Sequence, residues 1–311
     1  THQLSPSVLE ALIEAQVPAV MTVHEHSLGC PSGRRYVPHL NETCRRCFDG
    51  SLMSAVQHRC VQDRTLPSLL AATAVAAHRR SRIYQRGIQL FLCPSETARD
   101  AALAGGIDRE RTRILRYAID VRAFVPSTDP GDYFFCYGRL TPEKGQMTLL
   151  EAAALAPEIP VRIAGTGPDE PRLRAFARDN NLKNVEFMGF IDGPTLHEAI
   201  RNARAVVVPS NYYETGPLTC LEAFALGKPV IGTDLGGIRE SIQSGETGIL
   251  VPPRDANALN EAMQLLHTQA GRCEEMGRHA ESVARNQCSA HLDALFSAYA
   301  DASTRNQGVP I

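Results

Sequence analysis

Short apolar runs and longer segments with helical periodicity alternate along most of the chain. Apolar runs bounded by turn residues predict buried strands, and apolar positions three and four apart predict helices. We expect strands at residues 18–23, 89–93, 113–116, 133–137, 161–164, 185–189, 205–208 and 229–232. We expect helices at residues 4–16, 66–86, 142–155, 170–180, 195–202, 217–226, 238–243 and 291–302, with Ser95 capping another. This alternation predicts an α/β fold in which helices cover parallel sheets.

Length and composition allow two domains. The chain has 311 residues, of which 43% are hydrophobic, enough for ordinary globular cores. Residues 125–131 are rich in proline, serine and aspartate and predict a linker. We therefore expect a first domain at 1–127, a second at 128–288, and a final helix and tail at 289–311. The net charge of −2 gives no signal for nucleic acid.

A basic run, His78 to Arg82 with Arg86, follows an apolar stretch at 66–77. It is either a solvated helix face or an amphipathic helix that contacts anionic lipid. No apolar stretch reaches the roughly 18 residues of a membrane span, and no secretory signal opens the chain. We expect a cytoplasmic protein, with peripheral contact at the inner face of the membrane as an alternative.

The segment 209–227 places two carboxylates around the start of a helix. Pro217 suits the first helical position and Gly227 suits a left-handed stop, so Glu214 precedes the helix and Glu222 lies inside it. The helix start suits phosphate, and the carboxylates suit sugar hydroxyls. Solvated charges are the alternative. A glycosidase pair is disfavoured, because its carboxyl groups stand about 5 to 9.5 Å apart, whereas eight positions along a largely helical path span about 12 Å.

A second candidate site begins where the strand at 133–137 ends. Thr141 and Pro142 predict a helix start, which places Lys144 in the first turn, against the helix dipole. An anion would compensate that conflict, and Arg139 could hold phosphate with it. A solvated basic pair is the alternative. Loops at 165–167, 189–192, 211–216 and 234–237 follow other strands, so we expect all of them at one edge of the sheet.

The span 133–255 resembles the C-terminal domain of family 4 retaining glycosyltransferases. The matching motifs are YGRLTPEKG (137–145), IAGTGP (163–168), VEFMG (185–189), VPSNYYETGP (208–217), LEAFALGKPV (221–230) and GGIRE (236–240). The resemblance implies the GT-B architecture of two facing Rossmann-like domains. It also implies that the first domain is truncated, because no segment here matches the family's opening strand and glycine-rich loop.

The resemblance assigns roles to individual residues. It implies that Arg139 and Lys144 bind the donor diphosphate, that Glu214 binds the transferred sugar, and that Glu222 binds the ribose. It also implies that His24 faces the donor sugar, although a histidine at a strand end is often structural. The other implied donor contacts are Gly138, Gly165, Gly189, Phe190, Ile191, Thr215, Gly216, Leu218 and Thr219.

The resemblance implies transfer of a sugar from a nucleotide-diphospho-sugar with retention of configuration and without a catalytic cofactor, in cell-surface polysaccharide or glycolipid synthesis. The alternative is a binding or assembly module that does not turn over. A dinucleotide-dependent oxidoreductase is disfavoured, because no G-x-G-x-x-G opens a first βαβ unit. The nucleobase, the sugar, the acceptor and the oligomeric state do not follow from the sequence.

Four of the nine cysteines lie in one polar insertion at 29–62. Cys30, Cys44, Cys47 and Cys60 have the spacing C-x13-C-x2-C-x12-C. Because a cytoplasmic chain does not normally keep disulfides, we expect a structural zinc site of four thiolates. Free thiols and disulfides are the alternatives, and His58 is a substitute ligand.

Overall fold

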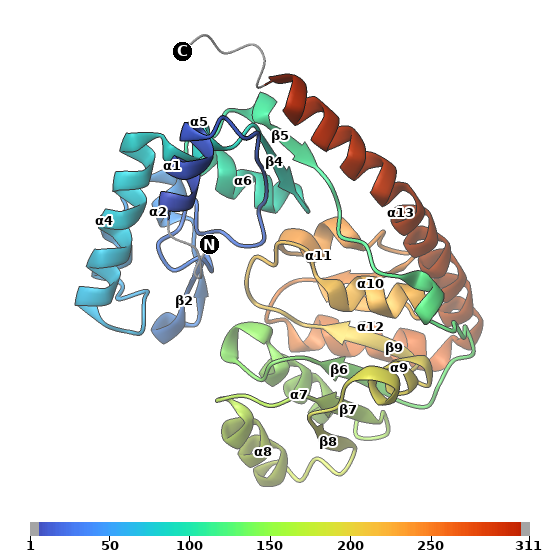
Figure 1. Cartoon of the computed structure of the whole chain (residues 1–311). Helices are drawn as coiled ribbons and strands as arrows, with labels where there is room; N and C mark the ends of the chain where they lie inside the picture. Colours follow the sequence, from blue (N-terminus) through green and yellow to red (C-terminus); the bar gives the residue numbers. More distant parts are fainter. Residues whose placement is uncertain (1–5, 306–311) are drawn as a thin grey trace. The chain divides into compact units, whose positions relative to one another are not determined.

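A parallel sheet forms the centre of each of the two units into which the chain divides (Figure 1). The computed structural model describes residues 6–305. The N-terminal unit comprises residues 1–117 and 290–311, and the C-terminal unit comprises residues 118–289. The division therefore falls before the predicted linker. The Ser127 N–H donates to the Leu226 carbonyl at 3.0 Å, which ties that stretch to the C-terminal unit.

The sheet of the N-terminal unit has the strand order β1-β4-β5, all parallel. The strands are β1 (Val20–Thr22), β4 (Leu90–Cys93) and β5 (Thr112–Ile114). Alternate side chains of β4 enter two cores: Phe91 and Cys93 pack with residues of β1 and α6 and their flanking loops, whereas Leu90 and Leu92 pack with Ala298 and Ala302. Both faces of this central strand are therefore buried.

The helices beside this sheet differ in part from the prediction. They are α1 (Ser7–Glu14), α4 (Thr65–Ser81), α5 (Ile83–Gly87), α6 (Glu96–Ala104) and the last part of α13 (Ala270–Arg305). The first residues of the predicted helix at 4–16 lie outside the described residues. The single helix predicted at 66–86 is wrong, because Arg82 is left-handed, with φ of 52°, and separates α4 from α5. The Ser95 cap is confirmed by a bond from the Ala98 N–H at 3.0 Å.

Helix α4 is polar at one end and apolar at the other. Leu66 and Leu70 near its start are exposed, and the basic residues follow in its last turn. Arg79 of that turn donates to the Gly29 carbonyl at 3.0 Å. Lipid contact stays a prediction. Among residues 6–305, none of the helices has the length and apolarity needed to cross a membrane.

The cysteine segment, residues 29–62, contains only short elements. Strands β2 (Tyr36–Val37) and β3 (Glu42–Thr43) pair antiparallel around the turn η1 (Pro38–Leu40). Helices α2 (Arg46–Asp49) and α3 (Met53–Gln57) follow.

The C-terminal unit contains a six-stranded parallel sheet with the order β11-β10-β9-β6-β7-β8. Its strands are β6 (Phe134–Tyr137), β7 (Val161–Ala164), β8 (Val185–Gly189), β9 (Ala205–Val208), β10 (Val230–Thr233) and β11 (Gly248–Val251). This is the Rossmann strand order. The chain builds the sheet outward from β6 to β8 on one side and then from β9 to β11 on the other, so the order of the strands reverses between β6 and β9. A ligand crevice is expected at the carboxyl ends of those two strands.

Helices connect these strands. They are α7 (Gln146–Leu155), α8 (Glu170–Asp179), α9 (Gly193–Arg201), α10 (Leu218–Ala225), α11 (Gly236–Ser241), α12 (Ala256–Thr268) and the first part of α13. The predicted starts of α7 and α10 are wrong: a 3-10 turn, η4 (Pro142–Lys144), precedes α7, and Pro217 caps α10 instead of beginning it. Lys144 therefore ends η4 and does not lie in the first turn of α7, which begins at Gln146. Helices α9 and α11 each begin two residues before the predicted position. Strand β11 and helix α12 were not predicted.

Candidate functional site

The loops that follow β6 and β9 are fixed against each other where the strand order reverses. The Asn211 N–H donates to the Glu143 carbonyl at 2.7 Å. Gly145 has φ of 74°, and a Cβ there would lie 1.9 Å from the Pro209 carbonyl oxygen. Only glycine allows this close approach. The short turn η4 is therefore held directly beside the loop that carries Glu214.

Lys144 and Glu214 form an ion pair at this junction. The Lys144 Nζ lies 2.6 Å from Glu214 Oε1, and the two side chains are 25% and 11% exposed. Ser210 donates to the same oxygen at 2.9 Å, and the Tyr212 hydroxyl donates to Oε2 at 2.7 Å. Thr233 in turn donates to the Ser210 carbonyl at 2.8 Å. Glu214 is thus a rigidly oriented carboxylate that keeps lone pairs for further donors.

Tyr212 lies beside this ion pair. Its ring lies 5.3 Å from the Lys144 Nζ. Burial raises the pKa of Tyr212, and Glu214 raises that pKa further, whereas the charge of Arg139 lowers it. Arg139 itself is exposed and lies close enough for its charge to act on Tyr212. Lys144 is therefore the cation paired with the oriented Glu214 carboxylate, and the charge of Arg139 acts on its neighbour Tyr212.

A pocket of about 480 Å³ opens at the ends of β6, β7 and β8. Gly165 lines it. A Cβ there would be 1.8 Å from the Gly138 carbonyl oxygen, and the Gly165 N–H donates to the Gly189 carbonyl at 2.7 Å. Phe190 is 70% exposed beside this hollow. The lining residues are Tyr137, Gly138, Arg139, Ala164, Gly165, Thr166, Gly167, Phe190, Ile191, Asp192 and Leu196. The volume suits a ligand of nucleoside size.

Glu222 reaches this pocket through Tyr137. The Tyr137 hydroxyl donates to Glu222 Oε2 at 2.6 Å and lies 3.4 Å from the Thr219 carbonyl oxygen. Burial raises the pKa of Tyr137 well above its ordinary value, and Glu222 adds to the rise. The hydroxyl therefore stays protonated at neutral pH and orients the carboxylate.

Helix α10 begins with Leu218 directly after the Glu214 loop. The Gly237 N–H donates to the Glu214 carbonyl at 2.7 Å, which holds the loop in front of the helix. As at any helix start, the first N–H groups have no partner inside the helix and favour an anion. That Thr215, Gly216, Leu218 and Thr219 bind phosphate stays a prediction.

The structure thus brings most of the predicted donor residues together. Five of them line the pocket, Lys144 pairs with Glu214, and Tyr137 links Glu222 to the pocket. Glu214 before the helix, Glu222 inside it and the left-handed Gly227, with φ of 74°, are confirmed.

His24 belongs to the N-terminal unit and not to this cluster. Its Nδ1 lies 2.7 Å from the Tyr117 hydroxyl, and the two rings stack with centroids 5.6 Å apart. Its predicted role at the donor sugar is therefore not tested.

The sequence did not indicate Tyr137, Ser210, Tyr212 or the close contact at Gly145 as parts of the site. A weak signal existed for the tyrosines, since buried hydroxyl groups usually find a polar partner. Which partner each one finds depends on loops that are distant in the sequence.

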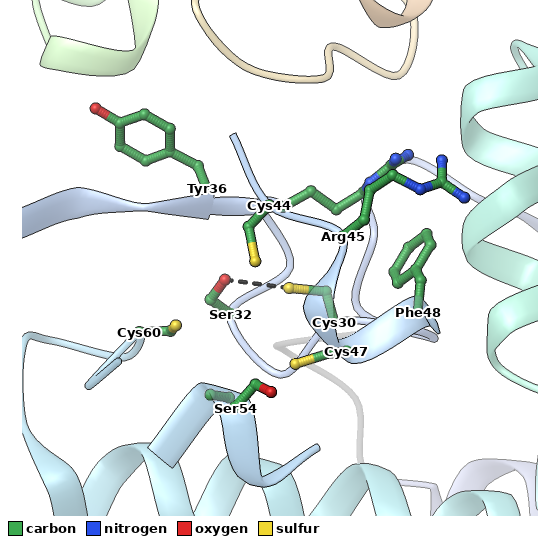
Figure 2. Close-up of a pocket in the computed structure, with 11 residues that line it drawn as sticks. Cys30, Ser32, Tyr36, Cys44, Arg45, Cys47, Phe48, Ser54 and Cys60 are labelled. Carbon is green, nitrogen blue, oxygen red and sulfur yellow. Dashed lines mark hydrogen bonds between the residues drawn. The ribbon is translucent and has the colours of Figure 1, made fainter. Parts of the chain in front are cut away.

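The four cysteines of the cysteine segment line one small pocket. Ser32 also lines this pocket, and its hydroxyl group lies 3.3 Å from the Cys30 sulfur (Figure 2). All four are free thiols. Burial raises the pKa of Cys47 to about 11 and that of Cys60 to about 12. Such thiols are poor nucleophiles, so a catalytic role for them is disfavoured.

As the side chains stand, no three Cys, His, Asp or Glu residues within the described range are placed to hold a metal ion. His58 lies outside the cysteine pocket, with its ring 6.4 Å from that of His39. The zinc site therefore stays a prediction at this point.

Comparison with known proteins assigns the C-terminal unit to a family. Residues 120–283 match the family described as "Glycosyl transferases group 1". A D-rhamnosyltransferase of Pseudomonas aeruginosa is 34% identical over 186 residues, covering 56% of this chain and 49% of the relative. A D-inositol 3-phosphate glycosyltransferase of Pseudarthrobacter chlorophenolicus is 31% identical over 225 residues, covering 66% and 53%. The chain spans about half the length of these relatives.

Solved structures extend the likeness to both units. The crystal structure of Anabaena HepE in complex with UDP and glucose matches with a TM-score of 0.68 and 17% identity, over 97% of this chain and 74% of that one. Sucrose-phosphate synthase of Thermosynechococcus elongatus matches with a TM-score of 0.64 and 25% identity, over 78% and 63%. The predicted class of fold, with Rossmann-like α/β domains of the GT-B type, is confirmed.

Proposed function

The chain belongs to the glycosyl transferases group 1 family, and we propose that it transfers a sugar from a nucleotide-diphospho-sugar to an acceptor with retention of configuration. The observation that carries the proposal is the junction of β6 and β9. There Lys144 forms an ion pair with Glu214 in the loop before α10, and Arg139, in the loop after β6 that also carries Lys144, lines the nucleoside-sized pocket.

The pocket accounts for the nucleoside part of the donor. The exposed Phe190 ring and the neighbouring Ile191 offer an apolar wall for a base, and Glu222 offers a carboxylate to the ribose hydroxyls. Tyr137 holds that carboxylate in place. Since the structurally similar Anabaena protein was crystallised with UDP, uridine is the first base to test.

The ion pair accounts for the diphospho-sugar part. The Lys144 ammonium has three N–H donors, so it can keep Glu214 and still donate to phosphate oxygens. Arg139 adds a planar guanidinium that suits the same oxygens. Glu214 remains beside the cations, where it can accept hydrogen bonds from hydroxyl groups of the transferred sugar.

Fixed positive groups then assist departure of the nucleoside diphosphate. Negative charge grows on the leaving phosphate in the transition state, and preorganised donors such as Lys144 and the amides of α10 stabilise it there more than in the ground state. The residues that we assign to this step are Arg139, Lys144 and the N-terminal turn of α10.

Binding is tested by thermal unfolding of the full chain with UDP, GDP and ADP sugars. A specific donor at 100 times its dissociation constant adds about 2.7 kcal/mol of stability. We expect stabilisation with one nucleotide and its loss in Arg139→Ala. Equal, negligible shifts with all three nucleotides would contradict the proposal.

Transfer is tested separately by release of nucleoside diphosphate and by the anomeric configuration of the product, followed by NMR. Binding without transfer would support the alternative of a nucleotide-sugar-binding module. A product with inverted configuration would overturn retention but not transfer.

A further inference from the structure

We propose that Cys30, Cys44, Cys47 and Cys60 bind one zinc ion that holds the cysteine segment together. The ligands are four thiolates, and the ion has a structural function in the N-terminal unit. The proposal is independent of the donor site, because all four cysteines belong to the other unit of the chain.

The four cysteines converge from three separate stretches of backbone. Cys30 lies in the loop before β2, Cys44 and Cys47 lie where the chain passes from β3 into α2, and Cys60 lies in the turn after α3. All four nevertheless line the same pocket, and their sulfur atoms are directed into one hollow (Figure 2). Thirty positions separate Cys30 from Cys60 in the sequence, so local structure alone does not bring them together.

The hollow between the four cysteines is small. Its volume is about 10 Å³, which is the room of a single water-sized sphere. An organic ligand does not fit in such a space, nor do the bridging sulfides of a cluster. A single ion surrounded by sulfur does fit, and tetrahedral sites made of four sulfurs select zinc or iron.

Positively charged side chains lie next to the cysteine pocket. Four thiolates around a divalent ion carry a net charge of −2, which favours nearby cations. Arg35 and Arg45 line the same pocket, and the Arg46 Nη1 lies 3.7 Å from the Cys44 sulfur. Arg35 is 1% exposed. A negatively charged site of thiolates and metal beside these guanidinium groups is stabilised by their positive charge.

The strands and helices of the cysteine segment are short, so the segment needs a cross-link. Strands β2 and β3 have two residues each, and helices α2 and α3 have four and five. Elements this short contribute few backbone hydrogen bonds, and small scaffolds of this kind usually depend on metal ions or disulfides. The four thiols are not joined in disulfides.

Binding requires a local adjustment. The sulfurs do not yet form a ligand set, although the backbone already surrounds the hollow. Rotation about the Cα–Cβ bond of each cysteine moves its sulfur without moving the chain. Four Zn–S bonds of about 2.3 Å then form and four thiol protons are released, so binding weakens as the pH falls.

The metal content of the full chain, purified without added metal and without a polyhistidine tag, tests the proposal. We expect one zinc per chain by mass spectrometry of metals, and its loss in Cys44→Ser and in Cys47→Ser. Cys288→Ser is the matched control, because that cysteine lies outside the pocket, and it should keep the metal.

A second measurement covers the case in which the ligand variants fail to fold. Titration of the unaltered protein with a thiol reagent should release zinc in step with modification of four protected thiols. Substitution with Co²⁺ should give the intense absorption bands of tetrahedral thiolate coordination. A chain that is folded, free of metal, and neither binds added Zn²⁺ nor changes its melting temperature with it would overturn the proposal. Stoichiometric iron would overturn the assignment to zinc.

Discussion

The junction of β6 and β9 in the C-terminal unit and the cysteine pocket of the N-terminal unit both gather side chains from distant parts of the sequence. Different features of the fold hold these side chains in place. At the junction, a six-stranded sheet fixes the loop positions, and backbone contacts such as that of Gly145 with Pro209 hold them. In the cysteine segment, strands of two residues cannot supply such a frame.

The difference between these two regions indicates where a fold needs a cross-link. A carboxylate can be oriented by neighbours alone when a sheet holds those neighbours, as Ser210, Tyr212 and Lys144 hold Glu214. Where the strands and helices are as short as in the cysteine segment, we infer that the four cysteines themselves provide the cross-link by binding a metal ion. The experiments below test each half of that contrast.

Replacement of Lys144 by alanine should have the largest effect. The loss of one preorganised donor lowers kcat by about 100-fold to 1,000-fold, and here it also leaves Glu214 without its cation. The measurement is steady-state turnover in an active form of the enzyme. Lys183→Ala, which removes an exposed lysine between α8 and β8, is the control and should keep its rate. Turnover of Lys144→Ala within threefold of the control would reject its role.

Removal of the proposed zinc ion should act on one unit only. With a strong chelator we expect amide hydrogen exchange within residues 29–62 to accelerate at least tenfold, which corresponds to about 1.4 kcal/mol of local stability. Amides of the buried strand β9 serve as the internal control and should exchange at the same rate as before. Equal acceleration of amide exchange in both units would contradict the proposal that the metal ion stabilises only the cysteine segment.

Replacement of Gly145 by alanine should loosen the junction. The left-handed conformation costs a non-glycine residue about 1 to 2 kcal/mol, and the added Cβ would also press against the Pro209 carbonyl. We expect lower stability in chemical denaturation and weaker donor binding, because Lys144 moves with the turn. Gly271→Ala meets no atom within 4 Å. This control should be neutral or stabilising by up to about 1 kcal/mol.

Replacement of Tyr137 by phenylalanine should have the smallest effect. A hydrogen bond to a charged group contributes about 1.5 to 3 kcal/mol, and its loss leaves Glu222 less well oriented. We expect roughly tenfold weaker donor binding by calorimetry. Because the pKa of Tyr137 is raised, the hydroxyl stays protonated and the difference from the unaltered protein should not change between pH 7 and 9.

Tyr133→Phe is the matched control for that experiment. Its hydroxyl donates to the Ala199 carbonyl at 2.7 Å and does not line the pocket. It should lower stability and leave donor affinity unchanged. Equal losses of affinity in the two variants would mean that Tyr137 contributes to folding only.

The sequence by itself determined the alternation of strands and helices and the edge at which the candidate residues lie. Strands 161–164, 185–189 and 205–208 were predicted to the residue. Only 205–208 is a continuous apolar run buried on both faces, whereas 161–164 and 185–189 each contain one charged residue, Arg162 and Glu186, which form an ion pair at 2.8 Å. The helix signals of Pro217 and Gly227 placed Glu214 before a helix and Glu222 inside it. It failed at Arg82, where a left-handed residue interrupts a run with good helical periodicity.

Only the tertiary structure decided which groups are partners. The pairing of Lys144 with Glu214 joins positions seventy residues apart, and that of Tyr137 with Glu222 joins positions eighty-five apart. Local propensity carries no information on such distances, because the partners meet through the order of strands in the sheet and the close packing of loops. The convergence of the four cysteines has the same origin: their spacing suggested a common site, and the folded segment placed them around one hollow.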